Sequence, residues 1–500
     1  MGESLTAWLQ VEFHPPETGG RAVSDTLIQW VVIAAYLTFI FVKGVSKVRK
    51  IGDSDDFLVA GRNVRWWLIA TTMGATVIGG GYSVGAIGDA YEMGLVWAII
   101  ATGGYFHFVF SGLYVAPKFR EAKLYTVAGY FGHRFDERTR FVVMVLSLLF
   151  SVFIVAAQIA AIGSVLSTLL PSVEGGSQAI KYAILVGGAI VIIYSTAGGL
   201  LAVIHTDIYQ FLVLFAGFML TLFFIAPDVI SSWGKFADDV SNDFFRLGGG
   251  RGLMFLITTW FAFLLGETFA PGYATRYVIG RTVRDTKIGI AGIGFFLALT
   301  FPAVIFFIAL YARNVFPGIE SQQALPMVIR ELHNPVVAGL MIAALLSAVM
   351  SSADSALNSA TAIFTKDLFE HQLGWKDKGD RKILRLARYW TIALGASATL
   401  IAYVWPDIIA LLLFTYHTWA PGIIVPVVVG VFSKAQGRPL NAAIFYTILV
   451  SVGITLVYRL TPYAEDFDPA VFGVGVSTLT YFVLRPVFER RTRRLPDSAR

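Results

Sequence analysis

Long apolar segments recur along the whole chain and limit what it can fold into. A helix of about 20 apolar residues crosses a bilayer, and only helices or closed barrels satisfy every backbone hydrogen bond there. The composition agrees, because 56% of the 500 residues are hydrophobic and 14% are charged. We therefore predict an all-α integral membrane protein with thirteen spans, at 24–43, 66–86, 93–116, 141–169, 180–198, 203–226, 252–275, 288–312, 335–364, 386–405, 408–432, 440–458 and 468–486.

Basic residues are distributed unevenly between the loops. The loops after spans one, three, seven, nine and eleven, together with the C-terminal tail, carry 31 of the 39 Lys and Arg residues. Cytoplasmic loops are the ones enriched in Lys and Arg, so we predict a plasma (inner) membrane protein with its N-terminus outside and its C-terminus in the cytoplasm. The same bias explains the net charge of +6 without a nucleic-acid partner. Acidic residues gather in two loops of the other side, Asp238, Asp239, Asp243, Glu465, Asp466 and Asp468.

No soluble domain of useful size interrupts the spans. We expect one membrane domain, 1–500, with a core at about 66–432 and peripheral helices at about 24–43, 440–458 and 468–486. Cysteine is absent, which excludes disulfides and thiolate chemistry. The sequence has no metal-binding motif, nucleophile elbow or phosphate-binding loop, so we do not expect an enzyme.

One predicted span, 335–364, carries a polar face. Hydrocarbon cannot solvate such a face, which must therefore contact protein, water or an ion. Small oxygen-bearing side chains beside a carboxylate suit a hard cation such as Na⁺. Close helix packing, with hydroxyls bonded to the preceding turn, is the alternative, but an intramembrane acid such as Asp354 is costly without a function. At 100° per residue, about half of the helix surface holds Ser347, Ala348, Ser351, Ser352, Asp354, Ser355, Asn358 and Ser359.

Two other spans look interrupted. Span 66–86 contains three consecutive glycines from Gly79, and span 252–275 contains Gly266, Pro271 and Gly272. These are the first and sixth helices if spans two to eleven form two five-helix halves. Matched interrupted helices are the sequence pointer to a binding site in an inverted-repeat transporter, although glycines that only permit close packing are the alternative.

A longer motif carries a family resemblance. The segment Tyr194–Gln210, Y-S-T-A-G-G-L-L-A-V-I-H-T-D-I-Y-Q, resembles the signature of the sodium/solute symporter family, and A-V-M-S-S-A-D-S from Ala348 and the arginine Arg276 match as well. T-M-G-A-T-V-I-G-G-G-Y, from Thr72, is most similar to the choline-transporter-like branch. The resemblance covers roughly 24–490 and implies a ten-helix core of the LeuT type, alternating access and Na⁺ coupling.

The resemblance also implies ion sites. The family's main sodium site uses two carbonyls at the break of the first core helix and three positions on the eighth. A second ion or proton site is plausible at the family's T-D aspartate, whose alternative role is a structural hydrogen-bond or salt-bridge partner. Carried over, the main site is Ile69, Thr72, Ala348, Ser351 and Ser352, and the second is Asp207, Asp354 and Ser355, with Ser351 shared.

The substrate site follows by the same analogy. A carboxylate at Glu267, in the sixth-helix break, favours a cationic or amine-bearing substrate unless it pairs with a neighbouring helix. Choline-type relatives have tryptophans where this chain has Val77 and Ala270, which argues against choline itself. The predicted substrate residues are Thr71, Thr76, Gly79, Glu267, Tyr273, His417 and Trp419.

Together these features predict Na⁺-coupled symport of a small polar organic solute into the cell. A proton-coupled transporter on the same fold and, less favoured, a membrane sensor are the alternatives. We expect no cofactor besides Na⁺ as coupling ion. The expected partners are the small-molecule substrate, Na⁺ and the lipid bilayer, with the monomer as functional unit.

Overall fold

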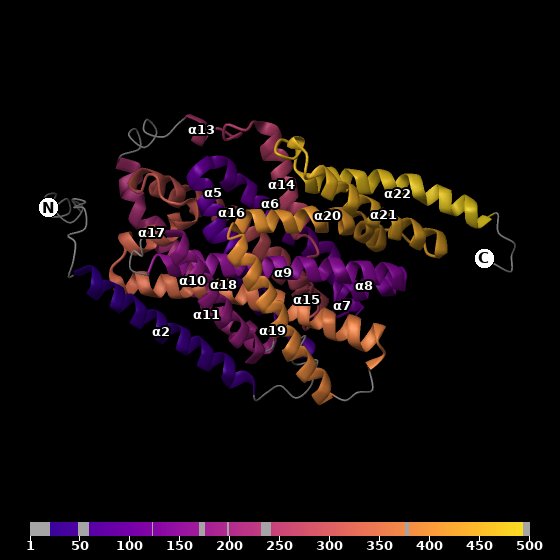
Figure 1. Ribbon diagram of the computed structural model, residues 1–500, viewed down its shortest axis with the longest axis horizontal. Helices are drawn as coiled ribbons and strands as arrows, with labels where there is room; N and C mark the ends of the chain where they lie inside the picture. Colours follow the sequence, from indigo (N-terminus) through magenta and orange to yellow (C-terminus); the bar gives the residue numbers. More distant parts are fainter. Residues whose placement is uncertain are drawn as a thin grey trace.

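The computed structural model describes residues 21–48, 60–122, 124–169, 176–197, 200–231, 242–375 and 380–493. Within these ranges the chain is helical and forms no strands beyond one isolated backbone bridge. The longer helices, labelled in Figure 1 except for α4, are α2 (Arg21–Val48), α4 (Trp66–Val77), α6 (Leu95–Phe110), α9 (Glu137–Ser167), α10 (Gly176–Ala197), α11 (Leu200–Ser231), α14 (Leu253–Glu267), α16 (Val283–Val315), α18 (Pro335–Ala362), α19 (Asp380–Val404), α20 (Ile408–Phe432), α21 (Arg438–Tyr458) and α22 (Pro469–Arg493). The shorter ones are α5 (Ala86–Met93), α7 (Ala116–Glu121), α8 (Val127–Arg134), α13 (Asn242–Phe245), α15 (Pro271–Tyr277) and α17 (Ala324–Leu332).

The prediction of an all-α membrane protein is confirmed. In the described part of the chain, nine helices are long and apolar enough to cross a membrane alone, and the bent pair α14–α15 makes ten. All thirteen predicted spans overlap helices, but those at 66–86, 180–198 and 386–405 do not pass that test. Thirteen crossings therefore remain a prediction.

The core helices pack as two matching sets of five. The first set is α4 with α5, α6, α9, α10 and α11, and the second is α14 with α15, α16, α18, α19 and α20. If each broken pair counts as one core helix, the second core helix packs against the seventh (α6 on α16) and the third against the eighth (α9 on α18). The fourth packs against the ninth (α10 on α19). Likewise α4 packs on α16 as α14 packs on α6. This exchange of partners is what a two-fold repeat requires.

The three remaining long helices lie at the periphery. Helix α2 packs on α11 and α18, whereas α21 and α22 pack together against α20. In Figure 1 they lie at opposite edges of the molecule. They therefore flank the core without entering it.

Both predicted interruptions are present. Helix α4 ends at Val77, Ile78 leaves the helical conformation with ψ 39°, and the chain continues in a π-helical turn, Gly81–Gly85, that leads into α5. Helices α14 and α15 meet at 54°, separated by residues that include Phe269 in the left-handed region at φ 64°. Each break leaves backbone groups free of helical partners.

A backbone bridge joins the segments that flank the two broken helices. The Val64 amide donates to the Ile279 carbonyl (3.0 Å), and the Arg281 amide donates to the Val64 carbonyl (2.8 Å). The Arg120 Nε donates to the neighbouring Gly280 carbonyl at 2.6 Å. The start of α4 and the end of α15 are therefore held together on the side that carries the basic loops.

Loops that the charge pattern assigned to the same side contact one another. On the basic side, Arg140 forms a 2.6 Å ion pair with Asp367, and Arg134 donates to the Ser433 carbonyl at 2.7 Å. Loops of the opposite, acidic side share one cavity, lined in part by Asp89, Glu92, Arg251, Asp407 and Asp468. The structure thus groups the loops as predicted, whereas the direction of the chain across a membrane remains a prediction.

Candidate functional site between the broken helices

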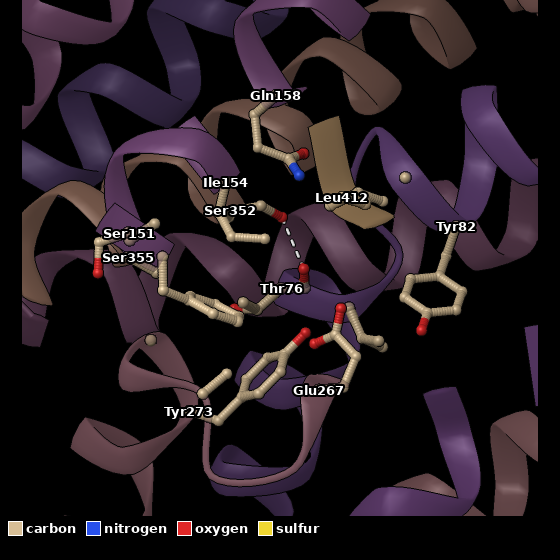
Figure 2. A pocket seen from close by; sticks show the side chains of 16 residues that line it. Thr76, Tyr82, Ser151, Ile154, Gln158, Glu267, Tyr273, Ser352, Ser355 and Leu412 are labelled. Carbon is tan, nitrogen blue, oxygen red and sulfur yellow. Dashed lines mark hydrogen bonds between the residues drawn. The ribbon is translucent and has the colours of Figure 1, made fainter. Parts of the chain in front are cut away.

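A cavity lies between the two breaks (Figure 2). Five of the predicted residues line it: Thr76, Glu267, Tyr273, Ser352 and Ser355. Glu267 is the one charged side chain among the described lining residues, and no basic residue is among them. The cavity therefore suits a ligand that is cationic or a hydrogen-bond donor.

The Glu267 carboxyl group is buried at the end of α14, with 3% of the residue exposed. Its Oε1 accepts a hydrogen bond from the Tyr416 hydroxyl on α20. Figure 2 shows the Tyr273 hydroxyl pointing toward the same carboxyl group. Tyrosines from two helices thus hold Glu267 in place, which agrees with the alternative of pairing with a neighbouring helix while leaving the group at the cavity wall.

A cluster of oxygens lies where α18 meets the break of α4. The Ser352 hydroxyl is 2.6 Å from the Thr76 carbonyl oxygen and 3.0 Å from the Ala348 carbonyl oxygen. Glycine is needed beside it, because a Cβ at Gly79 would be 2.4 Å from the Ser352 Oγ. Carbonyl and hydroxyl oxygens at one point are the donor set that a hard cation takes.

Two of the predicted sodium ligands do not lie at this break. Helix α4 continues past Ile69 and Thr72, and its helical bonding reaches the Ile78 amide, which donates to the Gly74 carbonyl. The Ile69 side chain instead faces Gly289 and Gly280. The physical reason is that the helix unwinds only from Ile78, six residues beyond Thr72 and directly before the three glycines.

The predicted second site divides into two separate groups. In the first, the hydroxyls of Thr72 and Ser351 both donate to the Asp207 carboxylate. The Arg276 Nη2 is 3.6 Å from Asp207 and donates to the Ser355 hydroxyl at 2.7 Å. Asp207 and Arg276 are both fully buried, so this network is an ion pair that joins α4, α11, α15 and α18.

Arg276 corrects the charge count above, which placed it in a basic loop. It is buried inside α15. Its pairing with Asp207 favours the structural alternative for that aspartate, because a guanidinium already compensates the carboxylate charge.

Asp354 belongs to the second group. Its Oδ1 accepts a hydrogen bond from Ser195 on α10, and its Oδ2 is buried with no hydrogen-bond partner among the described residues. Within the described part of the chain it has no hydrogen bond to Asp207, on α11, or to Ser355, on its own helix.

Four other predicted substrate residues lie outside the cavity lining. Thr71 donates to the Leu68 carbonyl of its own helix at 3.0 Å. His417 lies 3.4 Å from Asp468 and lines the acidic-side cavity instead. Trp419 is buried and donates to the Thr268 carbonyl at 3.1 Å, which ties α20 to the second break. The fourth is Gly79, which packs against the oxygen cluster.

Gln158 and Tyr416 are among the residues of the cavity region that sequence reasoning missed. Gln158 on α9 lines the cavity and accepts a hydrogen bond from the Gly80 amide at 2.8 Å. A lone amide within the apolar span 141–169 is a signal that could have found it. Tyr416 gave no such signal, since a tyrosine is ordinary in a helix of this composition.

Comparisons with known proteins give the fold and the family. The family model of the sodium:solute symporter family matches residues 57–438. A sodium/glucose cotransporter of Vibrio parahaemolyticus is 26% identical over 520 residues, which cover 91% of this chain and 93% of that protein. High-affinity choline transporter 1 of Caenorhabditis elegans is 26% identical over 433 residues, 78% of this chain and 72% of that protein.

A solved structure shares the fold. The structure of a Na⁺-coupled sialic acid symporter in a substrate-bound outward-open state superposes with a TM-score of 0.75 at 21% identity, covering 92% of this chain and 97% of that one. The family match spans well over half of the chain, from the segment before α4 to the start of α21. The chain therefore belongs to the sodium:solute symporter family.

Proposed function

We propose that this protein moves a small polar organic solute into the cell together with Na⁺, by alternating access. The observation that carries the proposal is the Ser352 hydroxyl, seated between the Thr76 carbonyl of the helix break and the Ala348 carbonyl of α18. Membership of the sodium:solute symporter family supports the choice of Na⁺.

The proposed sodium site uses the oxygens of Thr76, Ala348 and Ser352, with Ser351 one residue away. All are uncharged, so the bound ion keeps its charge and can be released in each cycle. An ion held there would fasten the break of α4 to α18 and would change the shape of the neighbouring cavity. Such coupling is reciprocal, and it typically amounts to about 5- to 150-fold in affinity.

For the substrate we propose a modest preference for an amine. Glu267 supplies a carboxylate at the cavity wall, and Tyr82, Phe150 and Tyr273 supply aromatic rings that attract a cation. Val77 and Ala270 line the same wall, where larger rings would be needed to enclose a quaternary ammonium. A primary or secondary amine on a polar solute fits this combination better than choline.

The test compares thermal unfolding of the purified protein in NaCl and in KCl at equal ionic strength. Na⁺ should raise the unfolding midpoint, because a ligand that binds the native state stabilises it. Ser352→Ala should raise the half-maximal Na⁺ concentration about tenfold or more, since it removes one of the oxygen ligands of the ion. Ser397→Ala is the control, because that exposed hydroxyl on α19 bonds only to its own helix.

Equal midpoints of the wild-type protein in Na⁺ and K⁺ would contradict the proposal. Uptake into vesicles driven by a pH gradient without Na⁺ would favour the proton-coupled alternative, for which the buried carboxyl groups of Glu267 and Asp354 offer candidate carriers.

A further inference from the structure

Gln158 is the one amide side chain among the described residues that line the cavity. It lies on α9 within the apolar sequence F-I-V-A-A-Q-I-A-A-I-G and is 5% exposed. The alanines around it bring α9 close to the broken helix, so that a Cβ at Gly80 would be 2.2 Å from the Ala161 Cβ. A buried polar side chain in an apolar helix is costly unless it has a hydrogen-bond partner or a function.

The contact of Gln158 is with the break itself. Its Oε1 accepts a hydrogen bond from the Gly80 amide, which the interruption of α4 has freed from a helical ladder. Both side chains face the position where Gly79 would carry a Cβ, since that Cβ would be 2.7 Å from the Gln158 Oε1 and 2.4 Å from the Ser352 Oγ. Gln158 therefore lies beside the oxygen cluster while it holds the Gly80 amide.

We propose that Gln158 is a positioning residue for the sodium site, which it serves by fixing the orientation of the break whose Thr76 carbonyl joins Ser352. The inference rests on the proposed function, because it assumes that Na⁺ binds at that cluster. Gln158 also lines the substrate cavity, as Figure 2 shows. It thus connects the cavity wall to the ion site through one hydrogen bond.

The bond also bears on selectivity for the substrate. Amides freed at a helix break are suited to binding an anionic group. At Gly80 the Gln158 carbonyl already occupies that amide. A carboxylate therefore finds less to bind on this side of the cavity, in agreement with the acidic wall at Glu267.

The experiment measures the Na⁺ concentration that gives half of the maximal rise in the unfolding midpoint, at constant ionic strength with KCl. Gln158→Met keeps the volume but removes the acceptor, and we expect that concentration to rise about three- to tenfold, the equivalent of one hydrogen bond. Gln158→Glu keeps an acceptor for the Gly80 amide, and a negative charge near the ion favours Na⁺, so the concentration should not rise above the wild-type value. Gln210→Met is the matched control, a second buried glutamine on a core helix, and should leave the concentration unchanged.

A role in folding alone gives a different result. A variant that affects folding alone would lower the unfolding midpoint in KCl but leave the half-maximal Na⁺ concentration at its wild-type value. The reason is that the Na⁺-free and the Na⁺-bound native protein would be destabilised equally. That result for Gln158→Met, or an equal rise for Gln158→Glu, overturns the inference. If Gln158→Met does not accumulate, Gln158→Asn, whose shorter side chain withdraws the carbonyl, replaces it with the same expectation. A wild-type protein without any response to Na⁺ would instead refute the proposed function.

Discussion

Three buried carboxyl groups in the core have three different partners. Asp207 pairs with Arg276, Glu267 accepts from Tyr416, and Asp354 accepts from Ser195. Of these, only Glu267 lines the cavity between the breaks. These three acids look alike in the sequence, but the group that compensates each carboxyl differs, and their functions therefore differ.

The ion pair predicts strong coupling between Asp207 and Arg276. Asp207→Asn leaves a buried guanidinium unpaired, and Arg276→Gln leaves a buried carboxylate unpaired; each should cost about 3–5 kcal/mol. The double variant removes both charges and should be less destabilised than the sum of the single variants. Thermal unfolding in KCl measures all four proteins, and strict additivity would show that the pair does not interact.

Glu267 predicts a selective effect on substrate binding. Glu267→Gln removes the negative charge from the cavity wall while keeping a hydrogen-bond acceptor for Tyr416. Binding of an amine-bearing solute should weaken about tenfold, and binding of a neutral one should change little. A panel of amine, neutral and acidic solutes, followed by ligand-induced stabilisation, checks this, with Glu320→Gln in a loop as control. Equal weakening for every class would remove the amine preference.

At the scale of helices, the interruptions were predictable and their position was not. The three glycines and the Pro271-Gly272 pair predicted two broken helices, because glycine and proline destabilise a helix interior. Propensity does not say where a helix of mixed residues finally unwinds, so Ile69 and Thr72 were expected at a break that begins at Ile78. Neighbouring helices decide that point, through contacts such as those of Gln158 and Ser352.

The packing around the first break predicts a sharp effect of one methyl group. Gly80→Ala would place a Cβ 2.2 Å from the Ala161 Cβ, so the break must shift away from α9. We expect the stabilisation by Na⁺ to be lost or to need at least about tenfold more Na⁺. Gly292→Ala is the control, because a Cβ there meets nothing within 4 Å. A wild-type response to Na⁺ in Gly80→Ala would mean that the break adapts freely.

At the scale of the whole molecule, the sequence predicted the class, the family and the grouping of loops. The length of the apolar segments and the distribution of basic residues between loops are properties of the sequence itself, so they can be read from it directly. Partners across the core are not, and for that reason Arg276 was counted with a loop although it is buried against Asp207. In the sequence it lies at the end of a short helix, whereas in space its side chain contacts residues of three other helices.

The arrangement of the two sides predicts which one gives access to the cavity. The backbone bridge at Val64 holds the start of α4 to the end of α15 on the basic side. We therefore expect the cavity to be closed there, so that a thiol in it reacts from the acidic side. The chain has no cysteine, and Ala356→Cys in the lining therefore provides a single reporter. In sealed vesicles containing NaCl, a membrane-impermeant maleimide should label it only from the acidic side, with Glu465→Cys and Lys434→Cys marking the two faces. Labelling from the basic side alone would contradict the closure.

The bridge between Val64 and the segment Ile279–Arg281 is made by main-chain groups only. A scan of ordinary substitutions would therefore leave both hydrogen bonds in place, and any loss of stability at Val64 would report only on its buried side chain. Proline is the exception, since Val64→Pro or Arg281→Pro deletes a donor amide. A mutational map that excludes proline would not detect this contact, whereas one that includes it should show proline sensitivity at two positions that are distant in sequence and hydrogen-bonded to each other.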